Sequence, residues 1–173
     1  AYVRRQRQMC IRDRHRIGEL SPVLIVTIEG TGPGEVIFYS HLDKQPSKPE
    51  LWSEGLHPLK AVRRDPWLYG RGSVDDGYGG YLCATSVRLL QEAGAPHPRC
   101  TMIIETCEES GSFDLPPYLE ALNEQLGNPD MVVVLVRRRP FDAYAVLEVR
   151  DRVSPRARTI LIGESLSSSR RHA

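Results

Sequence analysis

The sequence predicts an α/β fold in which helices cover a sheet, because strand-like and helix-like segments alternate along the chain. Apolar residues make up 40% of the 173 residues and charged residues 26%. No apolar run approaches the ~18 residues of a membrane-spanning helix, so a transmembrane protein is not expected. Short runs rich in β-branched residues, typical of strands, lie at 22–29, 36–39, 101–104 and 131–135.

The first strand, residues 22–29, is bounded by Gly30, Gly32, Pro33 and Gly34, which indicate a turn. The second, residues 36–39, is apolar at consecutive positions, a pattern that predicts a strand covered on both faces. Residues 44–67 contain four prolines and are therefore expected to form no long regular element.

Residues 78–93 have apolar residues at helical spacing, with Gly94 and Pro96 marking the end of the helix. The strand 101–104 follows, and Asp114 is then expected to cap a further helix. The predicted buried stripes comprise Cys83, Val87 and Leu90, flanked by Leu82 and Leu89, in the first helix, and Leu115, Leu119, Leu122 and Leu126 in the second.

The net charge of +1 conceals a segregation of charge along the chain. Residues 1–16 hold six basic and one acidic residue, residues 17–135 hold eight and 17, and residues 136–173 hold nine and four. All lysines lie in the middle segment. We therefore predict a distinct middle segment at 17–135, preceded by a basic flank at 1–16 that is disordered or artefactual. An Arg/Ser-rich tail at 136–173, out of frame or disordered, is expected to follow it.

The four cysteines form no C-x-x-C pair, which favours neither a structural zinc site nor a disulfide framework. Reduced thiols are typical of the cytoplasm, which is the expected location. The arginines of the two flanks also raise the alternative of phosphate binding to a nucleic acid. The flanks lack interleaved aromatic residues and the middle segment is acidic, so no nucleic-acid partner is expected.

Three groups of titratable residues follow predicted strands or precede a predicted helix. His41 and Asp43 come directly after the strand 36–39, and Asp43 is positioned to orient the imidazole of His41 if His41 binds a metal. Taken alone, such a pair is more often a surface His–Asp pair at the end of a strand. Period-two geometry allows both side chains to point to one side.

The acidic pair Asp75-Asp76 lies between glycines ahead of the helix 78–93, where one carboxylate can bridge two divalent cations. The alternative is a turn that caps the helix. Glu108-Glu109 follows the strand 101–104, and such a pair can provide one metal ligand and one general base. Its alternative is a solvated helix start.

Taken together, these groups resemble the M20 family of metallopeptidases. His41-Leu42-Asp43-Lys44-Gln45-Pro46 is similar to the family's H-x-D-x-x-P motif. Residues 68–76, Leu-Tyr-Gly-Arg-Gly-Ser-Val-Asp-Asp, are similar to L-Y-G-R-G-x-x-D, and residues 108–112 are similar to E-E-x-G-S. Together with Trp52, the first motif most resembles the dipeptidase and carnosinase-type members.

The resemblance implies that residues 17–135 are the N-terminal part of a metallopeptidase catalytic domain, a helix-covered mixed sheet of the zinc-peptidase type that is incomplete here. It also implies two divalent cations, zinc before manganese or cobalt. It implies that His41, Asp75 and Glu109 bind metal, with Asp75 bridging, that Asp43 supports His41, and that Glu108 is the general base. The implied substrate is a dipeptide or short peptide, with neither a nucleic acid nor a membrane as partner, and the full-length parent is expected to be a homodimer.

Two ligands of the family's five have no counterpart in this chain. After the strand 131–135 the chain continues Val136-Arg137-Arg138-Arg139, where the family has an acidic ligand, and His172 is a poor candidate for the final histidine. The expected function is therefore peptide-bond hydrolysis in the parent family, with this chain an inactive fragment. The alternatives are a deacylase or amidohydrolase of N-acyl amino acids and a non-catalytic domain of the same fold.

Overall fold

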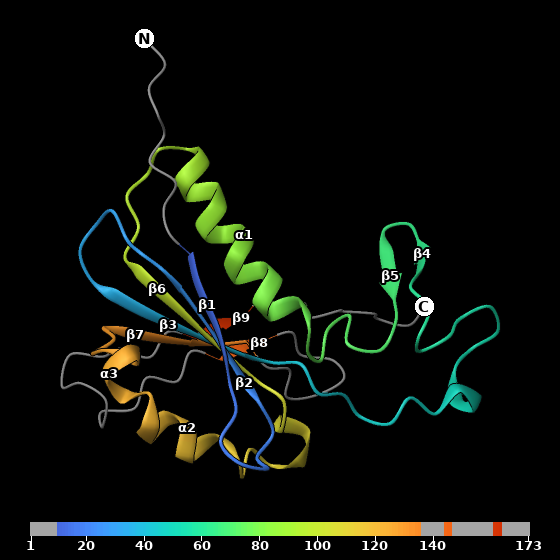
Figure 1. Ribbon diagram of the computed structural model, residues 1–173. Helices are drawn as coiled ribbons and strands as arrows, with labels where there is room; N and C mark the ends of the chain where they lie inside the picture. The colour runs from blue at the N-terminus through green and yellow to red at the C-terminus, as the bar shows by residue number, and fades with distance from the viewer. Residues whose placement is uncertain (1–9, 136–143, 147–160, 164–173) are drawn as a thin grey trace.

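The computed structural model describes residues 10–135, 144–146 and 161–163 of the chain. They form a mixed seven-stranded sheet in the order β1-β2-β6-β3-β7-β8-β9, with helices on both sides (Figure 1). No helix in these ranges is both long and apolar enough to span a membrane. The sheet strands are β1 (Cys10–His15), β2 (Val23–Ile28), β3 (Glu35–His41), β6 (Arg99–Glu105), β7 (Met131–Val134), β8 (Tyr144–Val146) and β9 (Leu161–Gly163).

The centre of the sheet is parallel, since β3 pairs in parallel with β6 on one side and with β7 on the other. β2 joins the outer edge of β6 in antiparallel orientation. The β3–β6 register places His41 opposite Glu105, so both strands end at the same edge. Polar groups that follow parallel strands therefore meet at this edge.

The two faces of the sheet are covered by different helices (Figure 1). Helix α1 (Tyr78–Glu92) packs against β3 and β6 through a cluster that contains Cys83, Met102 and Ile104. Helices α2 (Leu115–Ala121) and α3 (Asn123–Leu126) contribute Tyr118 and Leu126 to the cluster on the other side. This arrangement confirms the helix-covered α/β sheet.

The buried stripe of α1 differs from the predicted one. Gly79, Cys83 and Val87 are buried at intervals of four residues, whereas Leu90 is 40% exposed. A step of three residues rotates a side chain about 60° away from the preceding one, so Leu90 lies beside the stripe. Leu82 and Leu89 are also exposed. The stripe is continued instead by the partly buried Gln91, whose Nε2 lies 3.1 Å from Nε2 of the buried His97.

The second predicted stripe is also wrong at one position, because Tyr118 is buried while Leu119 is 38% exposed. The hydroxyl of Tyr118 accepts a hydrogen bond from the backbone N–H of Ile17 at 3.0 Å, which allows the phenol to be buried. Asp114 precedes α2 but makes no capping bond; its Oδ2 accepts the N–H of Ser21 at 2.8 Å.

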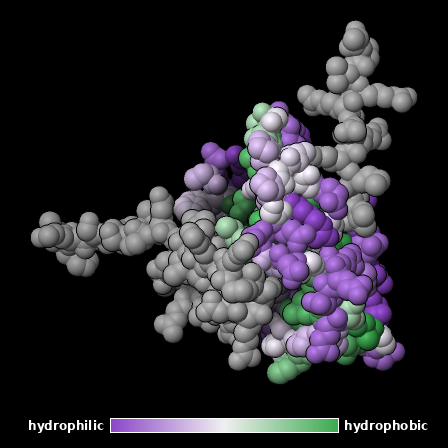
Figure 2. Space-filling view, turned by 90° about the vertical axis from the view of Figure 1, so that its left-hand side faces the viewer, coloured by the Kyte–Doolittle hydropathy of each residue, from purple (hydrophilic) through white to green (hydrophobic). Residues whose placement is uncertain are grey.

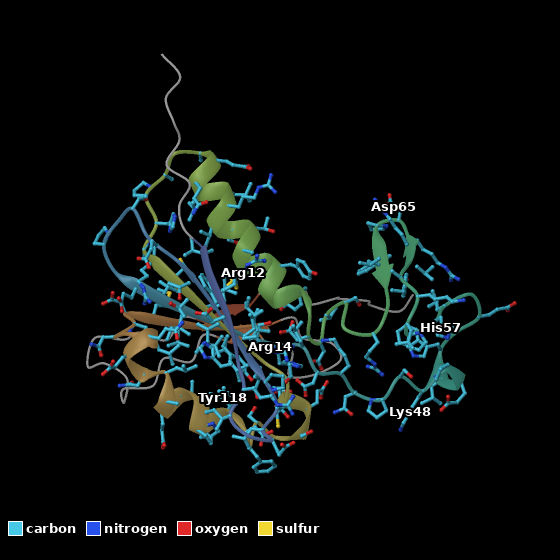
Figure 3. All side chains as sticks on the ribbon, in the orientation of Figure 1. Arg12, Arg14, Lys48, His57, Asp65 and Tyr118 are labelled. Atoms are coloured by element: carbon cyan, nitrogen blue, oxygen red, sulfur yellow. The ribbon has the colours of Figure 1, made fainter. Side chains whose placement is uncertain are left out.

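Residues 10–15 form a strand, although they lie in the basic flank that the sequence sets apart from the fold. β1 pairs with β2 along its whole length, and Arg12 and Arg14, labelled in Figure 3, are exposed on it. Charged side chains on an edge strand oppose pairing with another sheet. β8 and β9 likewise come from the segment 136–173. The three-part division of the chain stays a prediction.

The proline-rich segment contains short elements, as expected, and projects from the sheet (Figure 1). It includes the 3₁₀ turn η1 (Pro49–Leu51) and a two-stranded hairpin of β4 (Val62–Arg64) and β5 (Trp67–Tyr69). Lys48, His57 and Asp65 lie along this projection (Figure 3). The face shown in Figure 2 mixes hydrophilic and hydrophobic side chains.

Candidate metal centre

His41 is the last residue of β3, and its side chain is fully buried. Its Nδ1 lies 3.3 Å from Oδ1 of Asp43 and 3.3 Å from the Asp43 backbone oxygen. Because both neighbours are acceptors, the N–H group at Nδ1 donates a hydrogen bond to Asp43. The neutral ring then presents the lone pair of Nε2 on its other side, as a metal ligand does.

Two carboxylates face Nε2 of His41. Oδ1 of Asp75 lies 3.3 Å away and Oε2 of Glu108 lies 3.6 Å away. Nε2 is buried and has no hydrogen-bond partner among the described residues. A lone pair and two negative carboxylates repel one another unless a cation, either a proton or a metal ion, lies between them.

The separation of Nε2 and the Asp75 oxygen suits a shared metal ion. Two ligands bound tetrahedrally to zinc at about 2.05 Å lie roughly 3.3–3.4 Å apart. The observed 3.3 Å matches this spacing. The chemistry of the donors also suits zinc, since one imidazole nitrogen and carboxylate oxygens are among its usual ligands. His41 and Asp75 therefore fit a divalent cation.

Asp75 reaches His41 because the next residue, Asp76, anchors the loop that carries the two aspartates. Asp76 is fully buried, and its Oδ2 accepts the backbone N–H of His41 at 3.1 Å. Its Oδ1 accepts the N–H groups of Gly77 at 2.5 Å and Gly79 at 3.1 Å, at the start of α1. One carboxylate thus joins the end of β3 to the first turn of α1.

Gly79 permits this close approach. A Cβ atom at this position would lie 3.1 Å from Oδ2 of Asp76 and 3.2 Å from Cβ of Ser40. On the opposite side of the loop, Nζ of Lys44 donates to the backbone oxygen of Asp76. The loop is therefore held by contacts with both β3 and the segment that follows it.

The turn that follows β6 contains the 3₁₀ helix η2 (Glu108–Ser110) and is held by Asp43. Oδ1 of Asp43 accepts the N–H of Glu108 at 3.2 Å, and Oδ2 accepts the N–H of Glu109 at 2.8 Å. Asp43 therefore contacts both the imidazole of His41 and the Glu108–Glu109 turn. This second contact was not expected from the sequence.

The two glutamates of the turn differ in their surroundings. Glu108 faces His41, whereas Oε2 of Glu109 accepts a hydrogen bond from Nε2 of Gln45 at 2.6 Å. Burial raises the pKa of the Glu108 carboxyl above its ordinary value. His41 lowers this pKa, and the negative charges of Glu109, Asp75 and Asp43 raise it. A carboxyl with a raised pKa is suited to proton transfer.

The structure brings four of the predicted residues together, namely His41, Asp43, Asp75 and Glu108. Glu109 lies beside Glu108 in η2, but its carboxylate contacts Gln45 instead of His41. Within the described ranges, no three His, Cys, Asp or Glu side chains converge tightly enough to form a metal-binding group. The last residue of the expected fourth strand is Leu135, and residues 136–143, like His172, lie outside the described residues. Sequence reasoning assigned no role to Lys44 or Gln45 and treated Asp76 only as a member of the acidic pair, although all three lie within the motifs.

A partly parallel, helix-covered sheet with histidine and carboxylate side chains at the carboxyl ends of its strands is typical of metal-dependent hydrolases. Residues 37–162 match the model of Peptidase family M20/M25/M40, which is more than half of the chain. The chain belongs to this family of metallopeptidases. The match extends past residue 135 into the predicted tail.

Individual relatives agree with this assignment. Over 145 residues, the chain is 28% identical to a succinyl-diaminopimelate desuccinylase of Gluconacetobacter diazotrophicus, covering 83% of this chain and 37% of that protein. The M20 metallo-carboxypeptidase Sso-CP2 of Sulfolobus solfataricus has the same fold, with a TM-score of 0.63, 24% identity and coverage of 73% and 28%. Human carnosine dipeptidase 1 gives a TM-score of 0.57 and 25% identity, with coverage of 79% and 30%. The chain thus spans only about a third of these proteins.

Proposed function

We propose that the parent of this chain hydrolyses the peptide bond of dipeptides or short peptides with water activated by two divalent cations. The observation that carries the proposal is the buried Nε2 of His41, which faces Asp75 and Glu108 without a hydrogen-bond partner among the described residues. The similarity to human carnosine dipeptidase 1 supports the dipeptide substrate. Zinc is the proposed cation, because the His41–Asp75 spacing suits it.

In this proposal His41, Asp75 and Glu109 bind the cations, with Asp75 shared between them. Bound cations would lower the pKa of a water molecule and polarise the substrate carbonyl. Asp43 holds the His41 ring in the tautomer that leaves Nε2 free. Its carboxylate also fixes the two amides of the turn that carries Glu108 and Glu109.

Glu108 is the proposed general base. Its carboxylate takes a proton from the attacking water and returns it to the amine that leaves when the peptide bond breaks. The raised pKa favours holding that proton between the two steps. Glu109 has a different role in this proposal, since its carboxylate accepts a hydrogen bond from Gln45 whereas Glu108 faces His41.

We further propose that this chain is an inactive fragment. Three ligand positions of five leave each cation with two protein ligands, one of them shared, whereas catalytic zinc usually has three. The chain should therefore bind zinc weakly and hydrolyse dipeptides negligibly. Turnover of Ala-Ala at rates ordinary for an enzyme by the purified 173-residue chain with added zinc or manganese would contradict this.

The assignment of Glu108 is tested in a gene restored to full length. The restored enzyme should hydrolyse dipeptides, and Glu108→Ala should lower kcat by at least about 10²-fold, the usual contribution of a general base. The matched control is Glu120→Ala, because Glu120 is an exposed residue of α2, the helix on the sheet face opposite α1. Retained activity in Glu108→Ala would remove Glu108 as the base.

A second candidate is hydrolysis of the amide bond of an N-acyl amino acid. It is supported by the similarity to a succinyl-diaminopimelate desuccinylase over 83% of this chain. The same site would act on either bond, because both are amides attacked by water at a carbonyl. Comparison of kcat/KM for Ala-Ala and for N-succinyl-alanine in the restored enzyme decides between them.

The location and the assembly of the parent are also proposals. Cys83, Cys100 and Cys107 are free and buried, which supports a reducing compartment such as the cytoplasm. The family resemblance supports a homodimer for the full-length parent. Size measurement of the restored protein in solution tests the dimer.

A further inference from the structure

Glu105 is a buried carboxylate that the proposed mechanism does not use. It is the last residue of β6, lies opposite His41 in the parallel β3–β6 pair, and is 1% exposed. Its backbone oxygen accepts the N–H of Leu42, just after His41. Its position therefore links the end of β3 to the start of the turn that carries Glu108 and Glu109.

The Glu105 carboxylate accepts two hydroxyl groups on a single oxygen. Oε1 accepts a hydrogen bond from the hydroxyl of Ser112 at 2.8 Å and another from the hydroxyl of Tyr39. Burial raises the pKa of the Tyr39 phenol, and its hydrogen bond to Glu105 and the charge of Glu105 raise it further. The phenol therefore remains protonated and acts as the donor.

Ser112 lies at the exit of the Glu108–Glu109 turn, so Glu105 and Ser112 close the turn from its two ends. The N–H of Ser112 donates to the oxygen of Cys107 at 2.8 Å. Ser112 has a φ of +55°, in the left-handed region that non-glycine residues rarely adopt. Such a conformation persists where surrounding contacts enforce it, and here it accompanies the bond from the hydroxyl to Glu105.

Energetics argue against a purely stabilising role for this carboxylate. Its second oxygen, Oε2, is buried without a hydrogen-bond partner among the described residues. Burying a carboxylate is costly, and an apolar residue of similar volume is often as stabilising or more so. A carboxyl group buried under these conditions at the edge of a candidate site indicates a requirement for geometry.

We propose that Glu105 is a positioning residue that fixes the turn carrying Glu108 and Glu109 through Ser112 and Tyr39. The turn is then held from both sides, by Asp43 through the amides of Glu108 and Glu109 and by Glu105 through Ser112. The consequence for metal binding rests on the proposed function, in which Glu109 is a ligand. The consequence for the mobility of the turn does not.

The test compares four variants of the 173-residue chain. Glu105→Leu removes the acceptor at similar volume, and Glu105→Gln keeps one acceptor oxygen as the conservative rescue. Ser112→Ala removes the donor without changing the sheet. Ser110→Ala, an exposed serine of the same turn, is the matched control.

The first measurement is amide hydrogen exchange without metal. In Glu105→Leu and Ser112→Ala, the amides of Glu109 and Ser112 should exchange about tenfold faster, as expected for loss of a hydrogen bond to a charged group. The exchange rates of amides in the β2–β6 pair should be unchanged. Glu105→Gln and Ser110→Ala should exchange at the same rates as the unsubstituted 173-residue chain. If Glu105→Leu does not fold, Ser112→Ala decides the question. Unchanged exchange in the turn of Ser112→Ala would overturn the proposal.

The second measurement is the visible absorption of added Co²⁺, which reports ligand geometry. The spectrum should change in Glu105→Leu and Ser112→Ala and be restored in Glu105→Gln. Faster exchange with an unchanged Co²⁺ spectrum would overturn the positioning of metal-binding side chains. If the unsubstituted 173-residue chain gives no Co²⁺ spectrum while exchange responds as expected, the proposed metal binding by His41, Asp75 and Glu109 fails for this chain, and the role of Glu105 in fixing the turn stands.

Discussion

Substitution of Asp76 by alanine should destabilise the fold strongly, although Asp76 is not a proposed ligand. The variant leaves three backbone donors without their acceptor: His41 N at 3.1 Å, Gly77 N at 2.5 Å and Gly79 N at 3.1 Å. The bonds from His41 N and Gly79 N are buried, and that from Gly77 N is partly buried. Counting the two buried bonds at about 1.5 kcal/mol each and the third at about half that gives about 4 kcal/mol.

Removal of the buried charge itself returns part of this energy, so the expected net loss is about 3 kcal/mol. The assay is urea denaturation, which gives the free energy of unfolding and its dependence on urea concentration. Asp75→Ala is the matched control, because the Asp75 side chain is 41% exposed and faces His41 rather than backbone donors. It should change stability by less than about 0.5 kcal/mol.

The two variants should lose different properties, metal binding in Asp75→Ala and stability in Asp76→Ala. Asp75→Ala should abolish zinc binding in a folded chain, whereas Asp76→Ala should unfold at markedly lower urea concentration. A loss below about 0.5 kcal/mol in Asp76→Ala would refute the anchoring role derived from its three bonds. Equal destabilisation in both variants would refute the separate roles of the adjacent carboxylates, metal binding by Asp75 and anchoring of the loop by Asp76.

Two further predictions concern parts of the fold away from the metal centre. The hydrogen bond from the N–H of Ser21 lowers the pKa of Asp114, so the ionised form is favoured by folding. Its contribution to stability is therefore present above the unfolded-state pKa and lost as pH falls through the folded-state pKa. Asp114→Asn should lower the unfolding free energy at pH 7 but not at pH 2; an equal loss at both would contradict this. Burial raises the pKa of the Cys83 thiol to about 12. Cys83 should therefore resist iodoacetamide at pH 8 in the native chain and react in the urea-unfolded chain, as read by mass spectrometry of the Cys83 peptide; rapid labelling of native Cys83 would contradict its burial.

The strands and the helix α1 could be predicted because their signals are local. The β-branched runs at 22–29 and 101–104 coincide with β2 and β6, and the glycine after residue 93 follows the end of α1. The strand β1 could not be predicted from its arginines. Its place depends on pairing with β2, a partner that no local pattern specifies.

The predicted buried stripes were wrong where a polar or aromatic side chain contacts a residue outside its own helix. Tyr118 replaces Leu119 in the core because its hydroxyl reaches Ile17, 101 residues away. Gln91 continues the α1 stripe because it meets the buried His97. Such pairings arise from tertiary structure and leave no trace in the spacing of apolar residues.

The motifs name the residues of the candidate site, whose roles stay predictions, but they do not show how these residues are connected. The motifs placed His41, Asp43 and Glu108 after strands, and the parallel β3–β6 pair brings these strand ends together. Asp75 lies on the loop before α1, which Asp76 joins to β3. The anchoring role of Asp76 depends on backbone amides that a sequence cannot display. The role of Glu105 depends likewise on its burial and on hydroxyl groups from two other segments.

The most direct test of the metal centre is calorimetric titration of the purified 173-residue chain with Zn²⁺, beside the same titration of Asp75→Ala. The chain should bind Zn²⁺ weakly but saturably, and the folded Asp75→Ala variant should release no binding heat. Equal binding by both chains, or no binding by the unsubstituted 173-residue chain, would contradict the account of His41 and Asp75 as ligands of the same cation.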